Sequence, residues 1–181
     1  MTSDPLFTGP ELCGLEAHEI VTLLKAKEIS SADLIDAAVA RIDQTGPMIN
    51  ATPTLCEARA RAVDLSNQDT TPAGYLAGLP ITIKDLNAVA NVRTTFGTKG
   101  LTAFIPQKSD PLMDQLEQYG AVILGKTNTP EFGAGGNTFN DVFGQTRNPW
   151  NTTLNPGGSS GGAAASLAAG EIWLSQGSDH G

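Results

Sequence analysis

The sequence predicts an α/β fold in which N-terminal helices precede a mostly parallel sheet that is flanked by helices. Three observations predict this class. Apolar residues recur at helical spacing early in the chain, two short segments later in the chain have the composition of buried strands, and a segment with helix signals lies between them. We therefore expect residues 1–66 to form a helical segment and residues 67–181 to form an α/β core.

Two amphipathic helices are expected before the sheet, and a third leads into it. The first covers about residues 15–27, and Ser30 or Ser31 can cap the second by accepting a backbone hydrogen bond. The third is expected at about residues 55–65, with its charged side chains toward water. The apolar positions that define the first two helices are Leu15, Ile20, Leu23, Leu24, Leu34, Ile35, Ala38 and Ile42.

The expected sheet begins with a β-branched strand at residues 79–83. After a loop that contains Gly and Pro, Asp110 and Pro111 provide a cap and a first-turn proline for a helix, which Gly120 ends. Residues 121–124 follow with the wholly apolar sequence AVIL, which is typical of a strand covered on both faces. The order of strand, loop, helix and strand predicts a right-handed parallel crossover.

The segment NPGGSSGG at residues 155–162 places Ser159 and Ser160 between paired glycines. Glycine accepts positive φ and lets the main chain approach a ligand closely, so this backbone can bend to present a hydroxyl. An Ala-rich helix is expected at residues 163–169, and its first turn would point free N–H groups at whatever the serines hold. A Gly/Ser stretch is more often a linker, but linkers are seldom followed at once by an apolar helix.

Lys84 lies at the end of the first expected strand, beside Asp85. Burial there would lower the pKa of the amine, and a neutral amine near pH 7 can accept a proton from a serine. From the residues alone, a surface lysine that extends its charged end into water is the simpler interpretation.

Three segments in this order resemble the amidase signature family: GLPITIKD at residues 78–85, GKTNTPEF at residues 125–132 and GGSSGG at residues 157–162. The last residues, QGSDHG at 176–181, are similar to the start of the nucleophile loop of that family. The resemblance implies an incomplete amidase signature fold, with part of a mixed, mostly parallel sheet. It also implies hydrolysis of small-molecule carboxylic amides through a serine acyl-enzyme, without a metal or a cofactor.

The resemblance implies a catalytic site built on Lys84 and Ser159. The lysine that matches Lys84 is the general base of the family, and Ser159 aligns with the bridging serine of its Lys, cis-Ser, Ser triad, where it would relay a proton. The peptide bond before this serine is cis in the family, and Gly158 and the other flanking glycines make that geometry sterically accessible. Ser160 is interpreted as a packing or hydrogen-bonding neighbour.

The C-terminal loop supplies the other expected site residues. The backbone N–H groups of His180 and Gly181 would form part of the oxyanion hole, whereas Asp179 would hydrogen-bond within its own loop. The family pattern is Gly-Ser-Asp-x-Gly-Gly-Ser, and its final serine is the nucleophile; this chain carries the pattern only as far as Gly181. We therefore expect the polypeptide to be inactive by itself, as the N-terminal portion of a longer hydrolase.

Further expectations concern the segment at residues 125–132. Asn128 and Glu131 are expected to shape the wall of the cleft, and Thr127 is expected to reach the serine loop. Lys126 is interpreted as a surface lysine or as one that anchors a loop.

Two other functions stay open. The chain could belong to the glutaminase-like subunit of a tRNA-dependent amidotransferase, which delivers ammonia to a partner, or it could be a truncated remnant without catalysis. The substrate and the oligomeric state do not follow from these residues. An unpaired sheet edge would favour pairing with a missing C-terminal portion or with a second copy in a homo-oligomer.

Composition limits the partners and the compartment. The net charge of -8 disfavours nucleic acid and anionic membranes as partners. The N-terminus lacks the charged and apolar regions of a secretion signal. Cys13 and Cys56 have no metal or redox spacing, so we expect two reduced thiols in a cytoplasmic protein.

Overall fold

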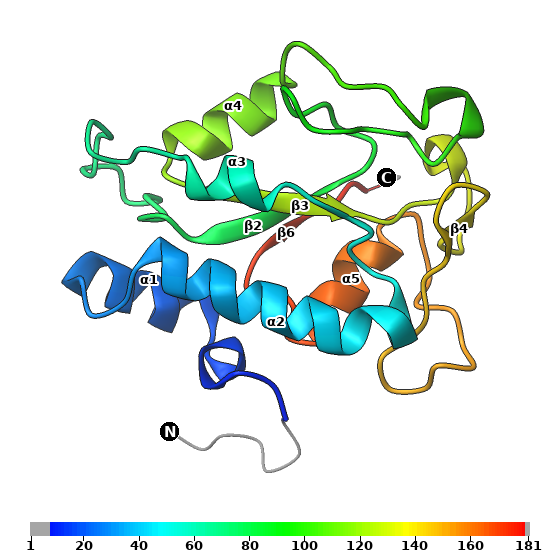
Figure 1. The fold of residues 1–181 in the computed structure, drawn as a ribbon, viewed down its shortest axis with the longest axis horizontal. Helices are drawn as coiled ribbons and strands as arrows, with labels where there is room; N and C mark the ends of the chain where they lie inside the picture. The colour runs from blue at the N-terminus through cyan, green and yellow to red at the C-terminus, as the bar shows by residue number, and fades with distance from the viewer. Residues whose placement is uncertain (1–7, 180–181) are drawn as a thin grey trace.

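A computed structural model describes residues 8–179 of the chain. Figure 1 shows the arrangement of the helices and strands. In chain order, the elements are η1 (Glu11–Gly14), α1 (Ala17–Ala26), α2 (Ser31–Ile49), β1 (Thr54–Leu55), α3 (Glu57–Arg61), β2 (Pro80–Lys84), η2 (Lys99–Leu101), α4 (Pro111–Gln118), β3 (Val122–Thr127), η3 (Glu131–Gly133), β4 (Phe139–Asn140), β5 (Gly144–Gln145), α5 (Gly161–Ala168) and β6 (Ser175–Gln176), where η marks a 3-10 helix.

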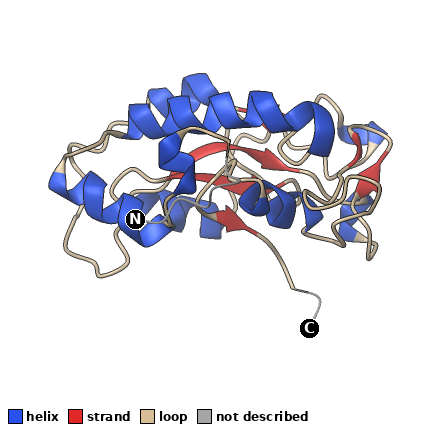
Figure 2. Cartoon of the chain, turned by 90° about the horizontal axis from the view of Figure 1, so that it is seen from below, coloured by secondary structure: helices blue, strands red, loops and turns tan. Residues whose placement is uncertain are grey.

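The main sheet contains four strands in the order β1-β3-β2-β6. Strand β2 pairs in parallel with both β3 and β6, whereas β1 is antiparallel to β3. Strands β4 and β5 form a separate antiparallel pair. Figure 2 shows helices on both sides of the strands. The predicted α/β fold, with a mixed and mostly parallel sheet flanked by helices, is confirmed.

The two predicted N-terminal helices are present as α1 and α2. Ser30 caps α2, because its hydroxyl accepts from the Asp33 N–H while the Asp33 carboxylate accepts from the Ser30 N–H. The predicted apolar positions Leu34, Ile35, Ala38 and Ile42 are all buried. The inner face of α2 therefore packs into the main core as its spacing predicts.

The third predicted helix is shorter than expected. Helix α3 covers only Glu57–Arg61, and Thr54 and Leu55 form strand β1 instead, paired with Lys126 and Gly125 of β3. Gly125 permits this close pairing, because a Cβ atom there would lie 2.7 Å from the Thr54 carbonyl oxygen. Strand β1 thus forms because it pairs with residues far away in the sequence. The spacing of apolar residues cannot indicate such a pairing.

Both predicted core strands are present, and both extend further toward their C-terminal ends. Strand β2 continues to Lys84, and β3 continues to Thr127. Every residue of the two strands is buried, as expected for strands covered on both faces. The connecting helix α4 begins at Pro111, and Gly120 follows it with a φ of 79°. The unit formed by β2, α4 and β3 therefore places two buried polar residues, Lys84 and Thr127, at the carboxyl ends of its strands.

Two findings concern what the described part of the chain lacks. None of the helices among residues 8–179 combines the length and the apolar composition needed to cross a bilayer. The same residues contain no group of three His, Cys, Asp or Glu side chains arranged to hold a metal ion.

Candidate active site

Three strands end next to one another at one edge of the sheet. Lys84, the last residue of β2, is paired with Thr127, the last residue of β3, and Ile83 is paired with Gln176 of β6. The side chain of Gln176 also accepts a hydrogen bond from the Lys84 backbone N–H at 3.2 Å. Ligands in parallel α/β sheets bind at the carboxyl ends of the strands, so this edge is the expected place for a site.

The Lys84 amine contacts three hydroxyl groups. Its Nζ atom donates to Ser159 Oγ at 2.6 Å, to Ser178 Oγ at 2.7 Å and to Ser160 Oγ at 3.0 Å. Lys84 itself is 0% exposed. The structure therefore brings the predicted base and the predicted bridging serine into direct contact, and it adds Ser178 from the segment after β6.

Burial lowers the pKa of the Lys84 amine below its ordinary value of 10.5. A hydroxyl can accept a hydrogen bond from an ammonium and can equally donate one to a neutral amine. The three serines can therefore satisfy both protonation states of Lys84. This arrangement can take up a proton from Ser159 and return it without moving heavy atoms.

The serine segment lies against the end of β2, where Ser159 and Ser160 contact Lys84. The peptide bond between Gly158 and Ser159 is cis. Gly158 allows close packing here, because a Cβ atom at this position would lie 2.9 Å from both the Asn137 nitrogen and the Gly135 carbonyl oxygen. The Thr129 hydroxyl donates to the Ser159 carbonyl oxygen at 3.1 Å. The backbone around Ser159 is thus packed against the loop that contains Gly135 and Asn137 and is held by Thr129, which follows β3.

Ser160 joins the serine segment to the chain after β6. It precedes helix α5 as its N-cap residue, and its hydroxyl accepts from the Ser178 N–H at 3.0 Å and donates to the Ser178 carbonyl oxygen at 3.2 Å. These contacts agree with the predicted hydrogen-bonding neighbour. They also bring the start of the C-terminal loop next to Lys84.

A second buried lysine lies on the next strand. Lys126 is 0% exposed, and its Nζ atom donates to Asp85 Oδ1 at 3.1 Å, to the Asn87 carbonyl oxygen at 2.7 Å and to Thr94 Oγ1 at 2.9 Å. Burial lowers the pKa of Lys126, while the charge of Asp85 acts in the opposite direction. Because Lys126 pairs with Ile83 and not with Lys84, the two lysines point to opposite faces of the sheet.

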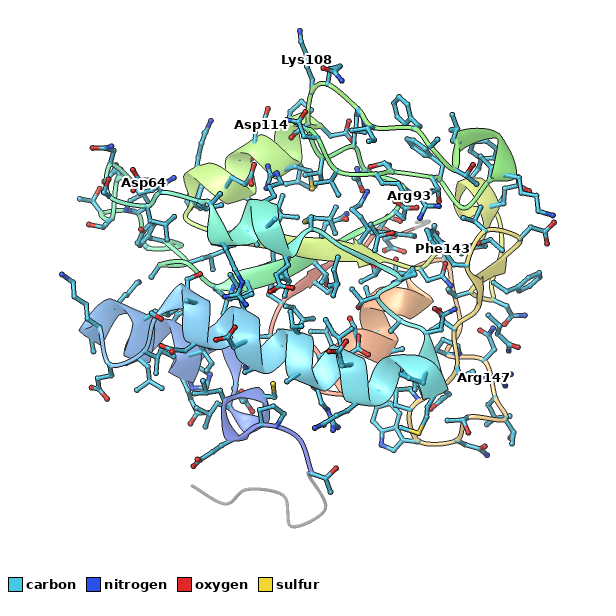
Figure 3. The ribbon with its side chains drawn as sticks, in the orientation of Figure 1. Asp64, Arg93, Lys108, Asp114, Phe143 and Arg147 are labelled. Carbon is cyan, nitrogen blue, oxygen red and sulfur yellow. The ribbon has the colours of Figure 1, made fainter. Side chains whose placement is uncertain are left out.

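The loop that follows Lys84 is fixed by this ion pair. Asp85 Oδ2 accepts from the Thr95 N–H at 3.0 Å and from the Thr95 hydroxyl at 2.6 Å. The same loop carries Arg93, whose guanidinium carbon lies 5.0 Å from the centroid of the Phe143 ring (Figure 3). The position of β2 at its carboxyl end therefore depends on Lys126 and Asp85.

The structure decides between the two alternatives for Lys126 and corrects the expectation for Thr127. Lys126 is not a surface lysine; it is fully buried and anchors the loop after β2, which is the other alternative that the sequence left open. Thr127 does not reach the serine segment, because its buried hydroxyl has no hydrogen-bond partner within the described residues. Thr129 makes that contact instead. It lies two positions beyond Thr127, past the end of β3.

The other predicted site residues are placed as follows. Asn128 is buried, and its side-chain amide donates to the Gly144 carbonyl oxygen and to Thr146 Oγ1, while Glu131 is exposed in η3. Asp179 is exposed. The expected oxyanion-hole residues His180 and Gly181 lie outside the described residues.

Sequence reasoning missed Ser178 and Thr129 as neighbours of the predicted pair. Ser178 stands in the GSD motif that was quoted for the resemblance, and the pairing of β6 with β2 would have placed it beside Lys84. Thr129 follows the end of β3, so the rule that parallel strands end at one edge could also have indicated it.

The chain belongs to the amidase family, because the family model described as Amidase matches residues 33–181. A glutamyl-tRNA(Gln) amidotransferase subunit of Carboxydothermus hydrogenoformans is 43% identical over 175 residues, which cover 94% of this chain and 36% of the relative. The corresponding subunit of Geobacillus kaustophilus is 45% identical over 170 residues, which cover 90% of this chain and 34% of the relative. The predicted membership of the amidase signature family is confirmed.

A solved structure shows the same relation. The crystal structure of a bacterial aryl acylamidase of the amidase signature enzymes family matches with a TM-score of 0.78 and 36% sequence identity, covering 87% of this chain and 34% of that chain. The chain thus spans about one third of the length of the curated relatives that it matches.

Proposed function

We propose that this chain supplies the general base and the proton-relaying serine of an enzyme that hydrolyses carboxylic amides through an acyl-enzyme. The observation that carries the proposal is the 2.6 Å contact between Lys84 Nζ and Ser159 Oγ, combined with the lowered pKa of a fully buried lysine. A neutral Lys84 would accept the Ser159 proton while Ser159 accepts the proton of the attacking serine. The base would then return the proton to the leaving amine.

The attacking serine belongs to the family pattern Gly-Ser-Asp-x-Gly-Gly-Ser, which begins here at Gly177. Residues 1–181 carry the pattern as far as Gly181. The backbone of His180 and Gly181 would contribute to the oxyanion hole of the extended enzyme, by which we mean these residues continued through Gly-Ser into the rest of an amidase domain.

The test compares variants of the extended enzyme. Lys84→Met is expected to reduce kcat/KM for an aryl acylamide by about 100- to 10,000-fold, the usual contribution of a general base. Lys108→Ala serves as the control, because Lys108 is an exposed lysine on the surface (Figure 3). Full activity of the Lys84→Met variant would show that the base has been assigned wrongly.

A second candidate function is supported by the relatives that are named as glutamyl-tRNA(Gln) amidotransferase subunits. In this case the extended enzyme would release ammonia from glutamine and pass it to a partner chain. Glutamine hydrolysis that is stimulated by co-purified partner subunits would favour this function. Hydrolysis of aryl acylamides without any partner would favour the free amidase.

A further inference from the structure

We propose that Thr138 is a positioning residue that sets the conformation of residues 157–161 and so holds Ser159 against Lys84. The structural part of this inference stands on the hydrogen bonds around Thr138. Its consequence for catalysis rests on the proposed function, and the two parts are tested separately below.

One hydroxyl joins both ends of the serine segment. Thr138 Oγ1 donates to the Gly157 carbonyl oxygen at 2.8 Å and accepts from the Gly161 N–H at 3.1 Å. Ser159 and Ser160, which contact Lys84, lie between Gly157 and Gly161 in the chain. Thr138 is 0% exposed, so water does not replace these bonds.

The position of Thr138 is itself fixed from two sides. Asn155 Oδ1 accepts from the Thr138 N–H at 3.2 Å and from the Gly157 N–H at 2.8 Å. The Thr138 carbonyl oxygen accepts from the Thr146 N–H at 3.0 Å, which ties it to the chain after β5. A Cβ atom at Gly161 would collide with the Thr138 hydroxyl, so the glycine admits this close contact.

This support differs from the contact that Thr129 makes. Thr129 binds one carbonyl oxygen in the middle of residues 157–161, at Ser159. Thr138 instead binds both ends of these residues and so fixes the distance between Gly157 and Gly161. Loss of the Thr138 hydroxyl would free Gly157 and Gly161 together. The segment between them could then move relative to Lys84, and a displacement of about 1 Å in an active site can cost on the order of 100-fold in rate.

Thr146 provides a matched control. It is 0% exposed like Thr138, and its hydroxyl also donates to a backbone carbonyl, Asn50 O at 2.7 Å, and accepts from a nitrogen, Asn128 Nδ2 at 3.0 Å. None of these contacts involves residues 157–161. Thr138→Val and Thr146→Val therefore remove hydroxyls of equal burial and equal bonding, and Thr138→Ser keeps the hydroxyl that the proposal requires.

The first experiment measures amide hydrogen exchange by NMR in the 181-residue chain, at Gly157 and Gly161. Thr138→Val is expected to raise exchange at Gly161 by at least tenfold, while Thr138→Ser and Thr146→Val leave it within about threefold of the unmodified chain. Equal exchange at Gly161 in Thr138→Val and Thr146→Val would overturn the proposal.

A second variant keeps the test decisive if Thr138→Val does not fold. Asn155→Ala, at a half-buried position, keeps the Thr138 hydroxyl but removes one of the two contacts that fix the position of Thr138, so the bonds of Thr138 to both ends of the segment should loosen. Faster exchange at both Gly157 and Gly161 would support a linked segment. Faster exchange at Gly157 alone would overturn it.

The second experiment measures kinetics in the extended enzyme. Thr138→Val is expected to lower kcat by about 10- to 100-fold with KM within about threefold, and Thr138→Ser is expected to restore most of kcat. An unchanged kcat in Thr138→Val would overturn the catalytic part. If the unmodified extended enzyme hydrolyses no amide, the proposed function fails, whereas the exchange result at Gly161 still decides the structural part.

Discussion

Two fully buried lysines lie on neighbouring strands, and their partners differ in charge. Lys126 faces the carboxylate of Asp85, whereas Lys84 faces the hydroxyls of Ser159, Ser160 and Ser178. Burial lowers the pKa of both amines, and at Lys126 the charge of Asp85 acts against this shift. Burial alone therefore does not make a lysine a base. In the function that we propose, Lys84 can serve as the base because its hydroxyl partners also tolerate the neutral amine.

The two lysines also differ in what their contacts hold in place. The Lys126 and Asp85 pair is satisfied on every side by backbone and hydroxyl groups and holds the loop after β2 in place. Lys84 lies at the other face of the same strand end, among side chains that are only partly buried or exposed. Lys126 thus supports the sheet, whereas Lys84 contacts the hydroxyls at which we propose the proton transfer.

The largest expected effect comes from breaking the ion pair. Lys126→Met leaves the Asp85 carboxylate buried without its partner, so the free energy of unfolding should fall by about 3–5 kcal/mol. Lys84→Met leaves only hydroxyls behind, and the change should stay within about 1 kcal/mol. Urea unfolding of the two variants checks the contrast. Equal destabilisation by both substitutions would contradict the distinction between the lysines.

A buried carboxyl group offers the same comparison with the opposite charge. Glu171 is 0% exposed and accepts from the hydroxyls of Thr45 and Thr52. Burial raises its pKa above the ordinary value of 4.5, while these hydrogen bonds and the charge of Arg41 act in the opposite direction. Glu171 and Lys84 thus both have hydroxyl partners, and the pKa of each is shifted in the direction that favours the neutral form.

This shift predicts a pH dependence with a definite sign. Between 4.5 and the raised pKa, the folded chain binds more protons at Glu171 than the unfolded chain, so stability should fall as pH rises through that window. Glu171→Gln should remove this part of the fall, with an effect of about 1.4 kcal/mol for each unit of the shift. Thermal unfolding across the window measures it. A fall of the same size in the variant would exclude Glu171 as its source.

The smallest expected effect concerns the third hydroxyl at Lys84. Ser178→Ala removes a group that accepts from the ammonium, so the pKa of Lys84 should fall slightly further. Ser175→Ala is a suitable control, because its hydroxyl contacts Thr82 and not Lys84. An upward shift in Ser178→Ala would mean that this hydroxyl favours the neutral amine.

The sequence predicted those features whose signals are local. The apolar spacing of α2, the capping box at Ser30 and the two buried strands are each present in short segments. The resemblance led to Lys84 and Ser159, since the segments that carry them are recognisable in order. These features needed no knowledge of distant contacts.

The features that were missed depend on contacts between distant residues. The strand β1 exists because Gly125 admits it, and Lys126 is buried because Asp85, which precedes it by 41 positions, neutralises it. The Thr138 contacts arise from a loop that folds back onto the serine segment. The spacing of residue types along the chain does not indicate such contacts, because they arise from the topology of the sheet and its loops.

The most direct test of the account is the titration of the Lys84 side chain in the 181-residue chain, followed by NMR and assigned from the signal that Lys84→Met lacks. We expect a midpoint below the ordinary lysine value of 10.5, because burial disfavours the ammonium. A midpoint at or above 10.5 would show that Lys84 stays charged beside Ser159. In that case it could not serve as the base.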